Sequence, residues 1–282
     1  MICYGIMQGR LTSSEGRGIQ FFPFENWQKE FFTAQEISLN EIEWIFDYDR
    51  YKENPIWTLS GRNEIMSIIR KTGVNVNSVC FDYFMRRSFY KHQKNERSEL
   101  YQENLDIAYH VIDGLADIGG RLLEIPMVDD SSLKTEEEEK YATEYVEKLA
   151  VYAVKRDIKI GLETDLAPGK FTDFLNRIKS CYVYANFDSG NSSGIGYKPN
   201  EEIPALGNRI YNVHIKDRIY KGSTVALGTG SADFDGVFKN LKNIGYKNSM
   251  ILQAAREKDG FETETIKGQL DFVKMYFKKY FS

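Results

Sequence analysis

Three side chains of types that bind divalent cations stand at the ends of short apolar runs in the second half of the chain. Glu163 follows an Ile-Gly-Leu run, Asp188 follows Asn-Phe, and His214 follows Asn-Val. Any one of them alone would more often be a hydrogen-bonded polar residue than a metal ligand. Two carboxylates buried together without a cation would be strongly unfavourable, so the trio predicts one shared metal ion.

Gln253 ends a fourth apolar run and offers a neutral amide oxygen at the equivalent position. The resulting donor set is rich in oxygen, which favours Mn²⁺, Mg²⁺ or Co²⁺ over Zn²⁺, although the imidazole also suits Zn²⁺. The chain has 3 histidines, and His92 and His110 fall in a polar loop and in a helical pattern. Because a cluster of zinc ions would need more imidazoles, we expect a single divalent ion.

Short β-rich runs alternate with longer amphipathic segments along the whole chain, a pattern typical of βα units around a parallel sheet. The runs that we predict to be strands are Ile2–Met7, Glu41–Phe46, Val74–Phe81, Arg121–Ile125, Ile158–Glu163, Tyr182–Asp188, Ile210–Ile215 and Ser249–Gln253. The segments that we predict to be helices are Trp27–Ile37, Asn63–Thr72, Glu96–Ile118, Thr135–Arg156, Thr172–Lys179, Phe234–Ile244 and Glu264–Tyr280.

Eight strands, each followed by a helix or helix-like segment, favour a closed α/β fold, the (β/α)8 barrel, over an open doubly wound sheet. An open sheet of that kind commonly has a glycine-rich first turn, and no G-x-G-x-x-G motif follows the first run. In a barrel the active site lies at the carboxyl ends of the strands. Glu163, Asp188, His214 and Gln253 are therefore expected to face one cavity.

Composition favours one ordinary globular domain. The chain has 282 residues, 42% hydrophobic and 28% charged, and α/β barrels of about 250 residues routinely form a single unit. A net charge of −4 gives no global attraction to nucleic acid or to an anionic membrane. The widely spaced Cys3, Cys80 and Cys181 are expected to be reduced core residues. With no basic leader and no apolar stretch of about 18 residues, a cytoplasmic enzyme is expected.

Several motifs lie at or after the ends of the predicted strands. They are Gly161-Leu162-Glu163, Asp188-Ser189-Gly190-Asn191, His214-Ile215-Lys216-Asp217, Leu227-Gly228-Thr229-Gly230 with Asp233-Phe234, and the N-terminal Gly5-Ile6-Met7-Gln8-Gly9-Arg10-Leu11. These motifs resemble the xylose isomerase-like barrel superfamily, and within it the sugar-phosphate isomerase/epimerase group that includes ketose 3-epimerases and ribulose-phosphate 3-epimerases. The resemblance spans the chain and implies that residues 1–282 form a single TIM barrel domain.

The resemblance also implies roles for individual residues. In such enzymes two Glu, one Asp and one His hold the metal, and the two Glu act as acid and base on opposite faces of an enediolate. This assigns Glu163, Asp188 and His214 as ligands and Glu163 also as the proton carrier. The eighth strand departs from the pattern, because Gln253 stands where the second catalytic Glu is expected.

The amide of Gln253 can bind a metal or orient a hydroxyl, but it cannot accept a proton near neutral pH. Inversion of a carbon usually needs two proton-transferring groups, whereas moving a proton between adjacent carbons on one face can use one. The sequence therefore favours an isomerase, in which the metal polarises the carbonyl and Glu163 moves the proton. A second base remains open, and the candidates are Asp82, Glu43, Glu124 and Glu257.

Cationic side chains after the strand ends are expected to bind a phosphate or another acidic group of a sugar. The predicted substrate contacts are Arg10, Asn191, Lys216, Arg218 and Arg256, with Arg10 and Arg256 as the better anion contacts. The expected partner is thus a small sugar or sugar phosphate, with no nucleic acid and no membrane. The oligomeric state is left open, and a homo-oligomer is compatible with the sequence.

Three alternatives to the isomerase remain. A ketose 3-epimerase would require a second carboxylate opposite Glu163. An apurinic-site endonuclease of the same superfamily is opposed by the acidic pI of about 5.6 and by the lack of a basic stripe. A non-catalytic sugar-binding descendant would bind its ligand without turnover, with Gln253 marking the lost chemistry.

Overall fold

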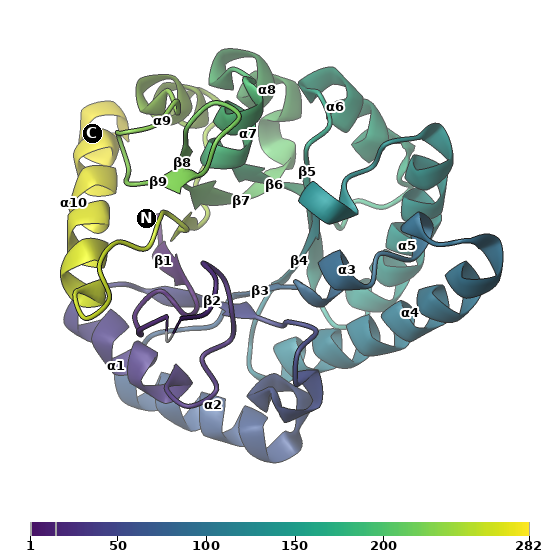
Figure 1. The fold of residues 1–282 in the computed structure, drawn as a ribbon, viewed down its shortest axis with the longest axis horizontal. Helices are drawn as coiled ribbons and strands as arrows, with labels where there is room; N and C mark the ends of the chain where they lie inside the picture. The colour runs from purple at the N-terminus through teal and green to yellow at the C-terminus, as the bar shows by residue number, and fades with distance from the viewer. Residues whose placement is uncertain (1, 15, 282) are drawn as a thin grey trace.

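Eight parallel strands close into a barrel in the computed structural model, which describes residues 2–14 and 16–281 (Figure 1). Around the barrel the strands follow the order β1-β10-β7-β6-β5-β4-β3-β2. Their bounds are β1 Tyr4–Met7, β2 Glu41–Ile45, β3 Ser78–Cys80, β4 Leu122–Met127, β5 Lys159–Thr164, β6 Val183–Asp188, β7 Ile210–Ile215 and β10 Met250–Leu252. The predicted barrel is confirmed, because each strand overlaps one of the eight predicted runs.

An outer ring of helices covers the barrel, visible in Figure 1 as a nearly complete circle. The seven helices that were predicted from the sequence are α1 Trp27–Glu36, α2 Leu59–Thr72, α4 Lys94–Asp117, α5 Glu136–Val154, α6 Pro168–Arg177, α9 Phe234–Asn243 and α10 Glu262–Phe281. The start of α5 shows why such segments fold locally: Thr135 and Glu138 form a reciprocal capping box at an acidic first turn.

Several shorter elements were not predicted. They are α3 Tyr83–Arg86, α7 Ser189–Ile195, α8 Pro199–Leu206, the hairpin β8 Asp217–Arg218 with β9 Thr224–Val225, and the 3-10 turns Tyr51–Glu53, Pro55–Trp57, Phe89–Lys91, Asp129–Ser131 and Gly207–Arg209. Helix α7 reads Ser-Gly-Asn-Ser-Ser-Gly-Ile, a composition that disfavours helix. It forms because the Asp188 carboxylate accepts hydrogen bonds from the backbone N–H groups of Gly190 and Asn191, both at 2.8 Å.

The cysteines only partly match the expectation of core residues. All three are free; Cys80 is buried and Cys3 half-buried, but Cys181 is exposed just before β6. The apolar residues that made Cys181 look like a core residue are those of β6, which begins two positions later. In the part of the chain that the structure describes, no helix combines the length and the apolar character needed to cross a membrane.

Candidate metal centre

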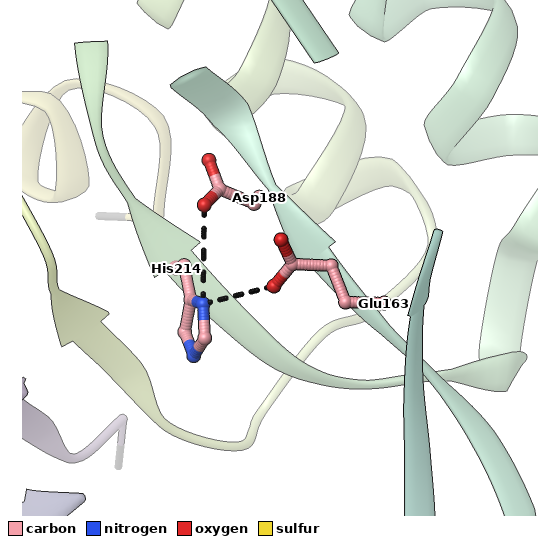
Figure 2. Close-up of side chains that lie close together, drawn as sticks. All are labelled: Glu163, Asp188 and His214. Carbon is pink, nitrogen blue, oxygen red and sulfur yellow. Dashed lines mark ion pairs between the residues drawn. The ribbon is translucent and has the colours of Figure 1, made fainter. Parts of the chain in front are cut away.

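Glu163, Asp188 and His214 meet at the carboxyl ends of the neighbouring strands β5, β6 and β7 (Figure 2). One potential ligand atom from each residue lies within 4.8 Å of the other two. The His214 Nδ1 atom lies 3.2 Å from Glu163 Oε2 and 4.0 Å from Asp188 Oδ2. All three residues are buried, at 5%, 3% and 1% exposure. The trio predicted from strand-end positions is thus brought together by the barrel.

The imidazole of His214 is held from its other side by Glu43, a residue of β2 across the barrel. His214 Nε2 lies 2.6 Å from Glu43 Oε1, so the proton on Nε2 has a carboxylate partner and Nδ1 faces the trio. The second oxygen of Glu43 accepts hydrogen bonds from Ser78 Oγ at 2.6 Å and from Asn212 Nδ2 at 2.8 Å. Metal-binding histidines usually have such a carboxylate behind them.

The two carboxylates of the trio are also oriented by neighbours. Asn186 Nδ2 donates to Glu163 Oε2 at 2.6 Å, and Asn191 Nδ2 donates to Glu163 Oε1 at 2.5 Å. Asp188 Oδ1 is occupied by the first turn of α7. Among the described residues, Asp188 Oδ2 has no hydrogen-bond partner, although the ammonium of Lys216 lies 3.5 Å away.

The electrostatics of the site fit a bound cation. Burial opposes the charged form of His214, but Glu43 and Glu163 raise the pKa of the imidazole well above its usual value. Burial would likewise raise the pKa of Glu163, but His214 and Lys216 lower it below the usual value. A metal-free site therefore holds a proton on His214 where a ligand lone pair is needed. Asp188 Oδ2, which accepts no hydrogen bond from the described residues, and the converging donors suit a divalent ion.

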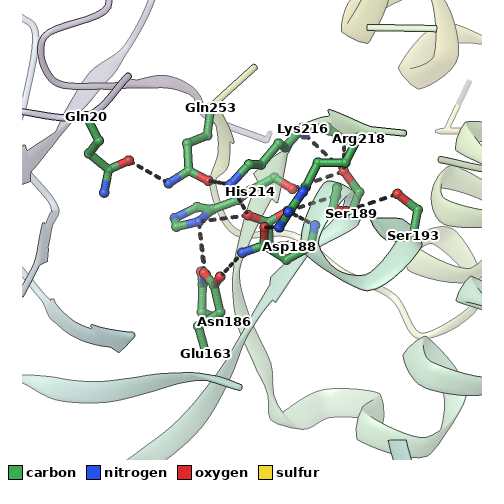
Figure 3. A network of polar contacts seen from close by, with 12 residues as sticks. Gln20, Glu163, Asn186, Asp188, Ser189, Ser193, His214, Lys216, Arg218 and Gln253 are labelled. Carbon is green, nitrogen blue, oxygen red and sulfur yellow. Dashed lines mark hydrogen bonds and ion pairs between the residues drawn. The ribbon is translucent and has the colours of Figure 1, made fainter. Parts of the chain in front are cut away.

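Gln253, which follows β10, faces the same cavity but sits across Lys216 from the trio (Figure 3). Its Oε1 lies 3.4 Å from Lys216 Nζ, and its Nε2 donates to Gln20 Oε1 at 3.1 Å. The ammonium of Lys216 thus stands between Asp188 and Gln253, which places a cation beside the buried carboxylate. The role of Gln253 as a fourth ligand stays a prediction.

A cavity of about 570 Å³ opens at this end of the barrel. Its lining includes Gln20, Asp82, Glu124, Glu163, Asn191, Lys216 and Gln253. Two of the predicted substrate contacts, Asn191 and Lys216, are therefore placed where a ligand in the cavity would meet them.

Arg10 and Arg256, the predicted anion contacts, are not among the residues that line this cavity. Both side chains instead donate hydrogen bonds to backbone carbonyl groups. Arg10 is buried and donates to the carbonyl oxygen of Ile19. Arg256 donates to the carbonyls of Gly9, Thr12 at 2.8 Å and Ile19 at 3.3 Å. In this conformation the two guanidinium groups hold the loop between β1 and α1, and their role as anion contacts stays a prediction.

Arg218, the remaining predicted contact, also bonds within the protein. Its Nη1 donates to Asn191 Oδ1 at 3.1 Å, and its Nη2 donates to the carbonyl of Gly222 at 3.1 Å. Because Asn191 in turn donates to Glu163, Arg218 stands one residue behind the trio. Its contact with substrate stays a prediction as well.

The four residues considered for a second base are separated by the structure. Glu43 is committed to His214, Ser78 and Asn212. Glu257 is exposed and lines a different depression, whereas Asp82 and Glu124 both line the cavity. Sequence reasoning did not identify Asn186 or Gln20 as site residues. Asn186 carried a readable signal, because it lies two residues before Asp188 and therefore on the same face of β6.

Comparisons with known proteins agree with this fold. A family model described as "Xylose isomerase-like TIM barrel" matches residues 31–275. The putative L-ribulose-5-phosphate 3-epimerase SgbU of Haemophilus influenzae is 24% identical over 249 residues, covering 83% of this chain and 85% of the relative. The D-allulose 3-epimerase from Methylomonas sp. in complex with D-allulose has a TM-score of 0.74 at 16% identity, covering 98% of this chain and 97% of its own. The IOLI protein with a bound zinc atom has a TM-score of 0.76 at 16% identity, with full coverage of both chains.

Proposed function

The chain belongs to the xylose isomerase-like TIM barrel family, and from this premise we propose that it is a metal-dependent sugar or sugar-phosphate isomerase or epimerase working through an enediolate. One observation carries the proposal: Glu163, Asp188 and His214 converge, buried, at the mouth of the barrel. The family alone would not assign chemistry, because one fold hosts many activities. The trio supplies the groups that can carry out the chemistry.

Glu163, Asp188 and His214 are the residues that would hold one divalent ion, which when bound polarises a sugar carbonyl and acidifies the adjacent C–H. Glu163 is the proposed proton carrier. Asn186 and Asn191 fix its two oxygens, and its lowered pKa keeps it ionised and able to accept a proton near neutral pH. Lys216 and Gln253 are proposed to orient hydroxyl or carbonyl oxygens of the sugar.

The metal and the sugar are proposed as classes. The sequence favours Mn²⁺, Mg²⁺ or Co²⁺, whereas the related IOLI protein holds zinc, so both groups of ions belong in the assay. The names of similar proteins point to ketoses, free and phosphorylated. If the substrate is phosphorylated, Arg10, Arg218 or Arg256 would have to exchange its present partner for the phosphate.

A one-base isomerase follows from Glu163 with the neutral Gln253. A 3-epimerase is the second candidate, and it is favoured by a specific observation: two further carboxylates, Asp82 and Glu124, line the same cavity as Glu163. A sugar-binding protein without catalysis is the third reading. A protein of this kind would bind the sugar, and the carbon-bound hydrogens of the sugar would not exchange with solvent.

The test is metal analysis of the purified protein followed by incubation with ketoses, aldoses and their phosphates in deuterated water. Incorporation of deuterium at carbon reports enediolate formation directly, whatever product accumulates. We expect metal-dependent incorporation that the variant Glu163→Gln lacks, while the matched surface variant Glu257→Gln retains it. Metal-replete protein that binds a sugar but catalyses no exchange would leave only the non-catalytic reading.

A further inference from the structure

Asp82 lies two residues after the end of β3 and lines the same cavity as Glu163, on the other side of β4. It is 8% exposed, so its carboxylate is largely removed from bulk water. The one-base isomerase scheme gives Asp82 no role. Its carboxylate accepts hydrogen bonds from Gln20 and Cys80, but it also lines the cavity, where a buried ionisable group is a candidate for acid/base chemistry.

The strand order places Asp82 and Glu163 at the ends of strands that are two positions apart in the barrel. Cys80 of β3 pairs with Glu124 of β4, and Pro126 of β4 pairs with Glu163 of β5. Asp82 lies two residues beyond Cys80, in the turn that begins α3. Strands are about 4.8 Å apart, so β3 and β5 are separated by roughly 10 Å. Because both carboxylates line the cavity, a sugar bound there can lie between them.

A directional hydrogen-bond chain connects Asp82 to the position where the family has its second Glu. Gln253 Nε2 donates to Gln20 Oε1 at 3.1 Å, and Gln20 Nε2 donates to Asp82 Oδ2 at 2.7 Å. The chain requires a donor at position 253, which an ionised glutamate could not be. The amide of Gln253 and the carboxylate of Asp82 are therefore linked through Gln20 in one hydrogen-bonded chain.

We propose that Asp82 is the second acid/base group of this site and that the enzyme inverts a carbon of its sugar between Asp82 and Glu163. The inference rests on the proposed enediolate chemistry and selects epimerisation within it. Glu43 is excluded as the second group by its three bonded partners, and Glu124 lies two residues deeper in the barrel, in register with Gly161.

The step balances with these two groups alone. Glu163 takes the proton from carbon, the C–H electron pair enters the enediolate, and protonated Asp82 donates a proton to the same carbon from the opposite face. Exchange of both groups with water restores the starting state. Burial raises the pKa of Asp82 to about 6, partly offset by the hydrogen bond from Gln20. A pKa near neutrality suits a group that must both give and take a proton.

The experiment uses the metal-loaded full chain, the ketose panel in deuterated water, and the variants Asp82→Asn, Asp82→Glu and Asp173→Asn. Asparagine keeps the size of Asp82 and can still accept a hydrogen bond from Gln20. Asp173→Asn makes the same exchange at an exposed position on α6, away from the cavity, and serves as the matched control. Metal content and thermal melting establish that each variant is folded and loaded.

We expect wild type to give exchanged substrate and inverted product. In Asp82→Asn the inverted product should fall by about 10²–10⁴-fold while exchange in recovered substrate stays within about threefold, because Glu163 still removes the proton. Asp82→Glu should recover part of the inversion with a shifted pH profile, and it tests the same point if the asparagine variant does not fold.

Two results would overturn the role of Asp82 and leave the enediolate chemistry standing. One is inversion by Asp82→Asn at the wild-type rate. The other is a wild type that exchanges deuterium but yields only the aldose–ketose isomer. A metal-loaded wild type that exchanges no hydrogen with any sugar of the panel would instead refute the proposed function itself, and the role of Asp82 with it.

Discussion

Nε2 of His214 lies 2.6 Å from Oε1 of Glu43, and both side chains are almost completely buried at the centre of the barrel. The pair links β7 to β2 across the interior, although the residues are 171 positions apart in sequence. It fixes the ring so that Nδ1 points at Glu163 and Asp188. Glu43 therefore orients His214 as a metal ligand without being a ligand itself.

Replacing Glu43 with Gln should weaken metal binding by about 10–100-fold, because the amide can still accept from Nε2 but brings no charge to support the imidazole. Titration of the metal-free protein with Mn²⁺ measures the change. The control is Glu257→Gln, which removes the same charge from an exposed position. Equal affinity of Glu43→Gln and wild type would mean that Glu43 is only a packing residue.

Bound metal should stabilise the fold through the trio. At a metal concentration about 100 times Kd, the free energy of unfolding should rise by about 2.7 kcal/mol, which corresponds to roughly 5–10 °C in Tm for a chain of this size. Asp188→Asn should abolish the increase, since it removes the negative charge of a buried carboxylate whose Oδ2 is free of hydrogen bonds from the described residues. Differential scanning calorimetry with and without Mn²⁺ gives both values, and a variant with an undiminished increase would place the ion elsewhere.

Metal affinity should rise with pH. His214 must lose its proton to offer Nδ1, and Glu43 and Glu163, against the effect of burial, raise the pKa of His214 well above its usual value. The metal-free protein thus keeps this proton above the pH at which a free histidine loses it. Affinity should increase by about tenfold per pH unit until the raised pKa is passed. Calorimetric titration in buffers of different ionisation enthalpy should detect the released proton; a pH-independent Kd would contradict this.

Gln253→Glu should tighten metal binding but lower the natural activity. The new carboxylate would add negative charge near Asp188 and could no longer donate to Gln20, which would break the contact chain to Asp82. Mn²⁺ titration and the deuterium-exchange assay measure the two effects separately. Restored or increased epimerase activity would show instead that the glutamine marks a loss from the family pattern.

Arg256→Lys should loosen the β1–α1 loop, because lysine cannot reproduce the guanidinium contacts to three backbone carbonyls. The free energy of unfolding should fall by about 2 kcal/mol in urea titrations. The loop should also be cleaved faster by proteases. Arg70→Lys, an exposed position on α2, is the control. An unchanged free energy of unfolding and an unchanged rate of cleavage would mean that Arg256 does not hold the loop and is available to bind an anion.

The strands and the trio were predictable for the same reason. Hydrophobic periodicity marks a barrel strand, and the fold rule that strands end at one rim places Glu163, Asp188 and His214 together. No distance is needed for that step. The partner of His214 was beyond such reasoning, because the direction of an imidazole across the barrel depends on side-chain geometry rather than on strand position.

The environments of the arginines and of Gln20 were not predictable. A sequence shows a cation after a strand end, but not that backbone carbonyls of a neighbouring loop already bind it, as they do for Arg256. Gln20 lies in an irregular segment and reaches Asp82 and Gln253 across separations of 62 and 233 residues. Helix α7 was missed because its serines and glycines disfavour helix, and only the cap from Asp188 compensates.

The two halves of the cavity differ in how far apart their residues lie along the chain. The three metal-binding candidates come from consecutive strands, whereas the Gln253–Gln20–Asp82 chain spans most of the polypeptide. Closing longer loops costs more entropy, and contacts between distant residues slow folding. During synthesis Asp82 and the trio are both made before β10, the strand that Gln253 follows. We therefore expect the Gln253–Gln20–Asp82 chain to be the last part of the cavity to form.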